Sequence, residues 1–313
     1  MTTKRLRVFD GGSNPELALE ICRYLDLEPG RSKNIRFSNG EFCPIIEESV
    51  RGLDVYVVQT ATHPVDSYLV ALLILIDALK RASVGRVTAV VPHYFYARQD
   101  KKTRGREPLT AKLVANLITK AGADRALFVD LHSSTLQGFF DIPTDHLYAL
   151  PILAGYFLKK QLERPVVVAP DAGGINRARA MAQRLDASLA VLEKERPEQN
   201  QVKVHQLIGE VKGRTAIVMD DMIDTAGTLS EGIRFLATKG VVEFYACCTH
   251  AVFSGPATKR LSECPLKELV VTNSVPVPQE KRLPNMTVLS LAGLIGDAIL
   301  RIHKDQSVSE LFK

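Results

Sequence analysis

Short runs of apolar and β-branched residues alternate with helical stretches along this chain of 313 residues. In the first half, strands are expected at 6–9, 54–58, 86–91 and 126–129, with helices at 15–25, 68–82 and 110–121. After Pro143 the pattern restarts, with strands at 166–169, 189–192, 216–219, 244–249 and 269–271 and helices at 151–161, 175–185, 229–239 and 291–303. Buried strands that alternate with helices favour parallel sheets covered on both faces. The predicted fold class is therefore α/β, with mainly parallel sheets flanked by helices.

The length suggests two domains. We place the boundary near Ala149, where Pro143 and Pro151 bracket a stretch without periodicity, so the domains are 1–148 and 149–299. A hydrophobic content of 46% with 24% charged residues is typical of a soluble globular protein. The net charge of +5 comes without a dense Lys/Arg run, which suits small polyanions and gives no reason to expect nucleic acid.

The remaining composition indicates a cytoplasmic protein with no membrane partner. The five cysteines are an odd number without metal-type spacing, so we expect reduced thiols. No apolar stretch is long enough to span a bilayer, and the basic start of the chain is not followed by the apolar region of a signal peptide.

Polar residues cluster where five of the expected strands end. In open α/β sheets, ligands bind beyond the carboxyl ends of the strands. One polar strand end means little, but five predict a large polar site that the domains could share. The clusters are residues 93–106, 130–133, 170–174, 193–196 and 220–221.

The segment from Asp220 to Thr228 is the most informative of these clusters. Small residues before a helix let backbone N–H groups close around an anion, and the helix dipole favours a phosphate there. Asp220 and Asp221 would repel that phosphate, so they need sugar hydroxyls or a cation as partners. A pentose 5-phosphate meets both requirements, because it has a phosphate for the helix start and hydroxyls for the two carboxylates. The alternative is an ordinary strand, turn and helix in which an Asp is the cap.

Two further clusters suit phosphate chemistry. The glycines of 170–174 permit close approach of a ligand, and Asp171 could bind Mg²⁺, although a plain turn explains the same residues. Lys194 and Arg196 would point to one side of an extended chain and could stabilise a transferring phosphoryl group. The alternative for this pair is a solvated charged loop.

The first domain offers weaker signals. His132 follows an expected strand, but His is uncommon as a ligand of Mg²⁺, so a merely hydrogen-bonded histidine is the alternative. Residues 94–108 are aromatic and then strongly basic, which suits a triphosphate better than nucleic acid because the block is short and isolated. In the expected hairpin turn 37–41, Phe37 could stack on a base and Asn39 or Glu41 could read its edge, or the segment could be only a turn.

Taken together and in this order, the motifs resemble the ribose-phosphate pyrophosphokinase family. The resemblance covers nearly the whole chain, and phosphoribosyltransferases share only the loop at 220–228. The stretches that carry it are 37–41, 96–102, 130–132, 137–141, 170–174, 194–196, 220–228 and 254–256.

The resemblance implies two phosphoribosyltransferase-like domains, with residues 300–313 folding back on the first and a catalytic site between them. It also implies a homohexamer in which a neighbouring subunit completes each ATP site. ATP would be held by Phe37, Asn39, Gly40 and Glu41 of the neighbour and by Arg98 and Gln99, and Mg²⁺ would lie near His132 and Asp171. Ribose 5-phosphate would bind to Arg196, Asp220, Asp221, Asp224, Thr225, Ala226, Gly227 and Thr228. Lys194 and Arg196 would be the catalytic cations, on a flexible loop.

The implied activity is that of a ribose-phosphate diphosphokinase, which transfers the β,γ-diphosphoryl group of MgATP to ribose 5-phosphate. The products are phosphoribosyl pyrophosphate and AMP. Members of the matching type are activated by inorganic phosphate and inhibited by ADP, and the corresponding positions here are Ser49, Arg51, Lys102, Ser307 and Ser309.

Three alternatives fit the sequence less well. A phosphoribosyltransferase would need neither 194–196 nor 96–102. A catalytically silent, synthetase-associated subunit would have an altered catalytic loop and insertions, and a purine-responsive transcription regulator would carry a DNA-binding module.

Overall fold

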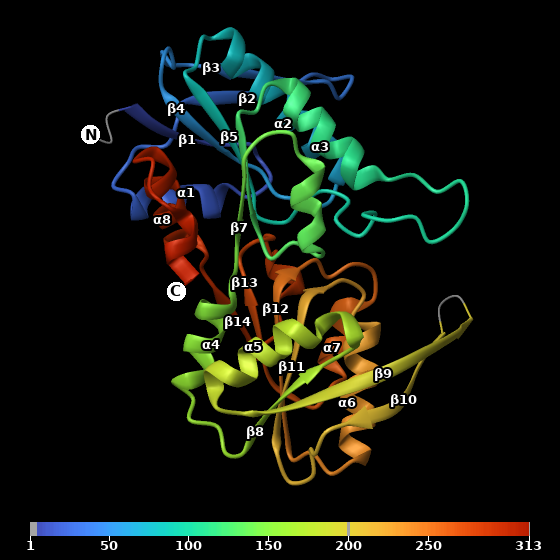
Figure 1. Ribbon diagram of the computed structural model, residues 1–313. Helices are drawn as coiled ribbons and strands as arrows, with labels where there is room; N and C mark the ends of the chain where they lie inside the picture. The colour runs from blue at the N-terminus through green and yellow to red at the C-terminus, as the bar shows by residue number, and fades with distance from the viewer. Residues whose placement is uncertain (1–4, 199–200, 313) are drawn as a thin grey trace. The chain divides into compact units, whose positions relative to one another are not determined.

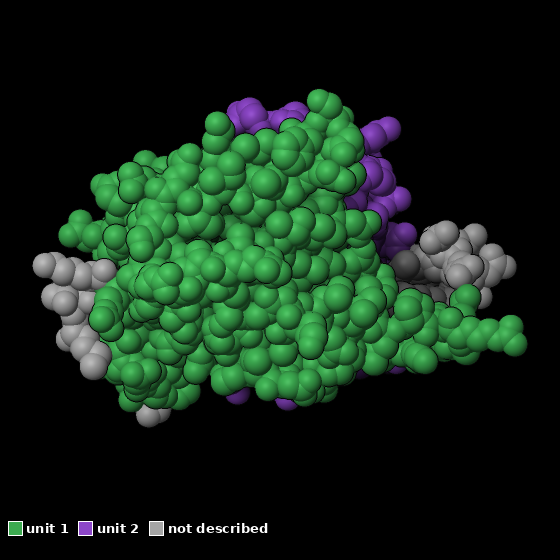
Figure 2. All heavy atoms as spheres, turned by 90° about the horizontal axis from the view of Figure 1, so that it is seen from above, with its two compact units in different colours: residues 1–148, 274–276, 290–313 green, residues 149–273, 277–289 purple. Residues whose placement is uncertain are grey.

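The computed structural model describes residues 5–198 and 201–312, and the side chains of residues 194–205 lie outside that description. The chain divides into two compact units, which Figure 2 shows in different colours. Unit 1 comprises residues 1–148, 274–276 and 290–313, and unit 2 comprises 149–273 and 277–289. Each unit has its own sheet and hydrophobic core.

The sheet of unit 1 has five parallel strands in the order β1-β4-β5-β6-β7. Helices α2 and α3 cover one face, and α1 and α8 cover the other (Figure 1). Every residue of β4 is buried, as expected for a parallel strand with helices on both faces. The elements are β1 (Leu6–Asp10), α1 (Pro15–Tyr24), β4 (Asp54–Val58), α2 (Val65–Arg81), β5 (Arg86–Val91), α3 (Thr110–Ala121), β6 (Arg125–Val129), β7 (Thr144–Leu147) and α8 (Ala292–His303).

Alternate residues of β4 face the two helical layers. Val55 and Val57 belong to the core cluster that includes Leu72 of α2. Tyr56 points the other way, and its hydroxyl donates to the carbonyl of Ile299 in α8 at 3.4 Å. The period of two along the strand thus divides the core of unit 1 into two layers.

A charge cluster at the start of β4 anchors the end of α8. Arg86 donates to both carboxylate oxygens of Asp54, at 2.8 and 2.6 Å, and His303 Nδ1 lies 2.8 Å from Asp54 Oδ2. Burial by itself would raise the pKa of Asp54, but the hydrogen bonds from Arg86 and His303 outweigh it and lower the pKa. The whole of α8 belongs to unit 1, whereas the tail expected from residue 300 would begin inside this helix.

The sheet of unit 2 has seven strands in the order β10-β9-β8-β11-β12-β13-β14. All neighbouring pairs are parallel except β9 and β10. Helices α6 and α7 contribute to the core cluster on one face, and α4 and α5 pack together. The elements are α4 (Leu150–Leu158), β8 (Pro165–Ala169), α5 (Ile175–Leu185), β9 (Ser188–Glu198), β10 (Gln201–Ile208), β11 (Thr215–Ile223), α6 (Gly227–Thr238), β12 (Glu243–Ala251), α7 (Ala257–Ser262), β13 (Leu266–Thr272) and β14 (Met286–Leu289).

The predicted α/β class with mainly parallel sheets is confirmed, and so is the hairpin turn at 37–41. It joins β2 (Ser32–Arg36) to β3 (Phe42–Ile46), and the amide of Phe37 donates to the carbonyl of Glu41 at 2.9 Å. Two strands differ from the predicted elements. Strand β7 lies in the stretch after Pro143, where no strand was predicted, and β9 continues past its predicted end at Leu192 to Glu198. Both misses have weak apolar patterns, and pairing with a neighbouring strand fixes their backbone.

All five cysteines are free thiols. Over residues 5–198 and 201–312, no helix combines the length and apolar character needed to cross a bilayer.

Candidate functional site

The acidic pair lies inside strand β11 and not after it. The predicted strand ended at Met219, but β11 runs to Ile223, because β12 pairs with it as far as Ile223 and Ala251. On its other edge, pairing with β8 stops at Val218. Asp220 and Asp221 therefore lie where β8 no longer pairs with this edge of the strand.

The two carboxylates of the pair differ in their exposure to solvent. The side chain of Asp221 is 6% exposed and that of Asp220 is 24% exposed. Burial, followed by the neighbouring charges of Asp221 and Asp171, raises the pKa of Asp220 well above its usual range. A site that concentrates carboxylates in this way favours a cation or a set of hydroxyl donors.

Arg177 is a cationic partner of this pair that the sequence analysis missed. Its Nη1 lies 3.5 Å from Asp221 Oδ1 and 4.0 Å from Asp220 Oδ1. It sits near the start of α5, where the helix dipole disfavours a cation and where no acidic residue is present. A cation at a helix start without an acidic residue in the same turn needs an acidic partner elsewhere. Such an isolated arginine was the signal in the sequence that could have identified Arg177.

The loop of residues 224–228, called the phosphate loop below, leads into α6. The N-cap of α6 is Ala226 and not Asp224, and Ala226 has the left-handed conformation with φ of 58°. No side-chain hydrogen bond caps this helix at Ala226. The first-turn N–H groups thus keep the orientation in which helix N-termini bind anions, and the interpretation of Asp224 as the N-cap is wrong.

Asp171 occupies the turn that follows β8, next to β11 in the sheet. Its Oδ1 accepts a hydrogen bond from the amide of Gly174 at 3.2 Å, so the carboxylate does close the turn, as the plain alternative expects. The negative charge of the same carboxylate contributes to the raised pKa of Asp220, after burial and Asp221. The role of Asp171 toward Mg²⁺ stays a prediction.

Three of the polar clusters come together at the carboxyl ends of strands in the unit 2 sheet, because β9, β8 and β11 are neighbours. The backbone at 193–196 belongs to β9, so the alternative of a solvated loop does not fit. Lys194 and Arg196 lie on this strand, but their side chains are outside the described residues. Their catalytic role stays a prediction.

In unit 1, the ends of the neighbouring strands β5 and β6 bear the other polar clusters. His132 is exposed in the turn after β6. That turn is held by His146 of β7, whose Nε2 accepts from the amide of Leu131 at 2.9 Å. Asp130 is buried there with φ of 41°. The turn therefore presents the imidazole of His132 at the surface of unit 1.

The segment after β5 separates into a core part and an exposed part. Tyr94 is buried and packs edge-on against Phe128 and Phe140, with ring centroids 5.2 and 5.8 Å away. Its aromatic ring is thus part of the core and does not form a stacking platform for bases. Arg98 and Gln99 are exposed, as the predicted contact with ATP requires.

The remaining nucleotide residues lie at the tip of the β2–β3 hairpin. Phe37, Asn39, Gly40 and Glu41 are all exposed, and Phe37 keeps 51% of its surface accessible. Asn39 Oδ1 accepts from the amide of Glu41 at 3.1 Å, which shapes the tip. An aromatic side chain held at a hairpin tip in this way is available to a base or to another subunit.

The predicted regulatory residues Ser49, Arg51, Lys102, Ser307 and Ser309 are all exposed and all belong to unit 1. The hydroxyl oxygens of Ser307 and Ser309 lie 2.8 Å apart. Arg301 fixes this end of the chain, since its Nη1 donates to the carbonyl of Ser307 at 3.0 Å and to Glu310 at 2.8 Å.

Comparisons with known proteins decide the family. Residues 6–122 match the model for the N-terminal domain of ribose phosphate pyrophosphokinase, and residues 201–313 match that for the phosphoribosyl synthetase-associated domain. The ribose-phosphate pyrophosphokinase of Gloeobacter violaceus is 55% identical over 100% of this chain and 95% of its own length. That of Bacillus subtilis is 50% identical over 99% of this chain and 98% of its own. The chain belongs to the ribose-phosphate pyrophosphokinase family.

A solved structure agrees with this assignment. The phosphoribosylpyrophosphate synthetase of Mycobacterium smegmatis superposes with a TM-score of 0.91 at 42% identity, covering 96% of this chain and 100% of that one. The enzyme class of the present chain is therefore ribose-phosphate diphosphokinase. Such an enzyme forms phosphoribosyl pyrophosphate and AMP from ATP and ribose 5-phosphate. The whole-chain match removes the alternative of a phosphoribosyltransferase.

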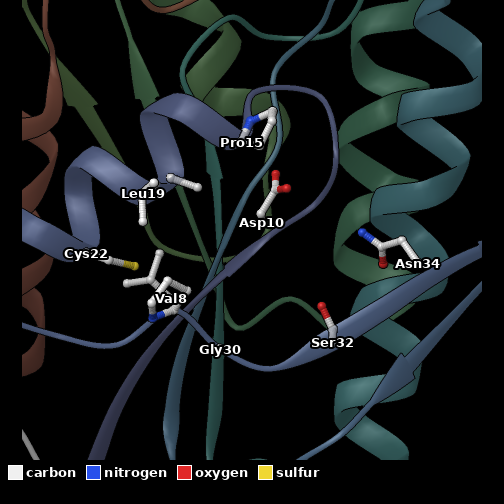
Figure 3. Close-up of a pocket in the computed structure, with 10 residues that line it drawn as sticks. Val8, Asp10, Pro15, Leu19, Cys22, Gly30, Ser32 and Asn34 are labelled. Carbon is white, nitrogen blue, oxygen red and sulfur yellow. The ribbon is translucent and has the colours of Figure 1, made fainter.

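One cavity of this pyrophosphokinase family member involves none of the predicted site residues. It has a volume of about 230 Å³ and lies between α1 and β2, where Asp10 and Asn34 supply polar groups and Leu19 and Cys22 apolar ones (Figure 3). Burial raises the pKa of Asp10 and raises that of Cys22 to about 11. Burial is the largest cause at both residues, and the negative charges of Glu28 and Asp10 add to the rise at Cys22.

Proposed function

We propose that the ribose 5-phosphate site of this diphosphokinase lies at the carboxyl end of β11 in the unit 2 sheet. The 5-phosphate binds to the N–H groups of the phosphate loop, and Asp220 and Asp221 accept hydrogen bonds from the ring hydroxyls. The observation that carries this proposal is the juxtaposition of two carboxylates on an open strand edge with a helix N-terminus that has no side-chain cap. Asp224, Thr225, Ala226, Gly227 and Thr228 form that phosphate site.

In this proposal, residues of unit 1 bind the nucleotide. Arg98 and Gln99 contact ATP from the same chain, while Phe37, Asn39, Gly40 and Glu41 reach it from a neighbouring subunit. The exposure of the hairpin tip supports this arrangement, because Phe37 is 51% exposed in the single chain. In this proposal the enzyme is a homohexamer in which subunits share the ATP sites. We also propose that it is cytoplasmic.

His132 of unit 1 and Asp171 of unit 2 are the proposed protein ligands of Mg²⁺. The described residues contain no group of three or more His, Cys, Asp or Glu side chains that could hold a metal. Mg²⁺ keeps several waters and binds through one or two protein ligands plus substrate phosphates, so the proposal needs no larger cluster. When bound, it would neutralise charge on the β- and γ-phosphates of ATP.

The protein's own contribution is alignment and charge stabilisation. Asp220 and Asp221 orient the sugar so that its anomeric hydroxyl attacks the β-phosphorus of ATP, the diphosphoryl group moves as a unit, and AMP leaves. Lys194 and Arg196 stabilise the charge that develops on the transferring group, and Arg196 also contacts the sugar phosphate. Inorganic phosphate activates and ADP inhibits at a second site formed by Ser49, Arg51, Lys102, Ser307 and Ser309.

One assay tests the activity and its control by phosphate. The purified chain is incubated with ATP, ribose 5-phosphate and Mg²⁺, with and without inorganic phosphate, and AMP release is measured. AMP is expected only when the sugar phosphate is present, and faster with inorganic phosphate. Release of ADP in place of AMP would contradict diphosphoryl transfer, and a rate indifferent to phosphate would remove the regulatory site.

A further inference from the structure

The segment that follows β12 holds the backbone of the phosphate loop from one side. The amide of Phe253 donates to the carbonyl of Ile223 at 3.0 Å, and the amide of Ser254 donates to that of Asp224 at 2.9 Å. The guanidinium of Arg260 in α7 donates from Nη1 to the carbonyl of Thr225 at 3.0 Å. Three consecutive carbonyls entering the loop are thus bound by residues 253–260.

These bonds also set the direction of the amides. In a planar trans peptide the C=O and the following N–H point to opposite sides. Holding the carbonyl of Thr225 toward α7 therefore directs the N–H of Ala226 away from α7. Ala226 has φ of 58°, a conformation that is unfavourable for a residue with a side chain. The bond from Arg260 helps to hold the peptide before it.

The same guanidinium lies across Gly227. A Cβ atom built at Gly227 would lie 3.2 Å from Nη1 of Arg260 and 3.9 Å from its Cζ. A side chain at this position would displace Arg260 or the loop. The helix α6 begins at Gly227, so the cation is placed next to the helix terminus that the 5-phosphate would occupy.

We propose that Arg260 is a positioning residue for the phosphate loop and sets the enzyme's affinity for the 5-phosphate of the sugar. It acts by fixing the peptide between Thr225 and Ala226 and by adding positive charge beside Gly227. The inference rests on the proposed sugar site. Arginine suits this role because its planar fork can bind the carbonyl while other N–H groups remain on the same rigid group.

Kinetics of matched variants test it. Arg260→Met removes the hydrogen bond and the charge, Arg260→Lys keeps the charge without the fork, and Lys259→Met removes an exposed neighbouring charge that has no part in the loop. For Arg260→Met we expect the KM for ribose 5-phosphate to rise roughly ten- to a hundredfold, as for loss of one charge-assisted hydrogen bond. The KM for ATP should stay within about twofold, Arg260→Lys should be intermediate, and Lys259→Met should match the parent.

Some outcomes overturn the inference without affecting the enzyme assignment. An unchanged KM for the sugar phosphate in Arg260→Met does so, and so does an equal loss toward both substrates together with a lower Tm, which marks a merely structural arginine. If the parent chain itself releases no AMP, the proposed function has failed instead.

A double-mutant cycle serves if Arg260→Met does not fold, with Gly227→Ala combined with Arg260→Lys. The two effects on sugar-phosphate KM should be non-additive because the groups are in contact. Simple additivity would overturn the inference.

Discussion

Replacing Asp220 by Asn is expected to stabilise unit 2 while abolishing the binding of ribose 5-phosphate. Asp220 lies among like charges in a partly buried strand, and Arg177 is the cation that offsets them, with its Nη1 4.0 Å from Asp220 Oδ1. Asn keeps the side-chain oxygen that accepts from the amide of Asp221 at 2.8 Å. The substitution thus removes a charge while the local hydrogen bond is retained.

The magnitude follows from the burial of Asp220 and from the charges around it. A unit charge about 4 Å away contributes about 4 kcal/mol at an effective dielectric constant of about 20. Two carboxylates, Asp221 and Asp171, oppose the ionised form, and Arg177 offsets one of them. Solvent screens the remainder, since the side chain is 24% exposed. We expect a gain of about 1–2 kcal/mol, typical of relieving strain at a functional site, which raises Tm by about 3–8 °C.

The sign of the pH dependence is fixed by the raised pKa of Asp220. Between the unfolded pKa of about 3.9 and the raised folded value, the folded chain binds more protons than the unfolded chain, so stability falls as the pH rises. Asn cannot lose a proton and escapes this fall. The two proteins should therefore melt alike near pH 4, and the gap should widen as the pH rises through the folded pKa.

Calorimetry in the presence of a chelator measures this gap between pH 4 and 8.5. The matched control is Glu163→Gln, which neutralises an exposed carboxylate in the same unit and should leave Tm within about 1 °C. A Tm for Asp220→Asn that is equal to or below that of the parent at pH 8 would refute the reasoning. A gain of constant size at every pH would refute it equally, because it would not come from the titration of this carboxylate.

Two further substitutions test separate parts of the site. Lys194→Ala should lower kcat by roughly 10²–10³ with little change in the KM for ribose 5-phosphate, as for loss of one preorganised donor; near-parental turnover would remove Lys194 from catalysis. Asp224→Ala should raise the KM for ribose 5-phosphate without unfolding the chain, because Ala226 and not Asp224 is the N-cap of α6. A collapse of Tm measured by calorimetry would instead give Asp224 a structural role.

The sequence was sufficient wherever one segment carries the whole signal. The apolar runs of β4 and β11 predicted buried parallel strands, and the structure has them. The segment around Asp220 predicted a site that combines an acidic pair with a helix start, because all of its residues are close in sequence. Strand β10 and the extension of β9 were missed, since their pairing with each other, and not an apolar pattern, defines them.

The partners of the site could not be predicted in the same way. Arg260 contacts Thr225 across 35 residues, because β12 returns the chain to the same edge of the sheet before α7 begins. Arg177 reaches Asp221 from the helix that follows a different strand. No spacing rule connects such residues, and only the order of strands in the sheet places them together.

The geometry of β11 gives an independent reason to regard its acidic pair as functional. A strand that ended at Met219 could have placed both carboxylates in solvent, where their repulsion would be small. Pairing with β12 instead carries the strand on to Ile223 and keeps Asp221 only 6% exposed, while β8 withdraws at Val218 and opens the other edge. Such an arrangement lowers the stability of the empty chain, because the charges are brought together and partly desolvated. In the proposed site, a polyhydroxylated ligand would reverse that loss by donating hydrogen bonds to both carboxylates. The free energy regained on binding would then favour a sugar phosphate over inorganic phosphate.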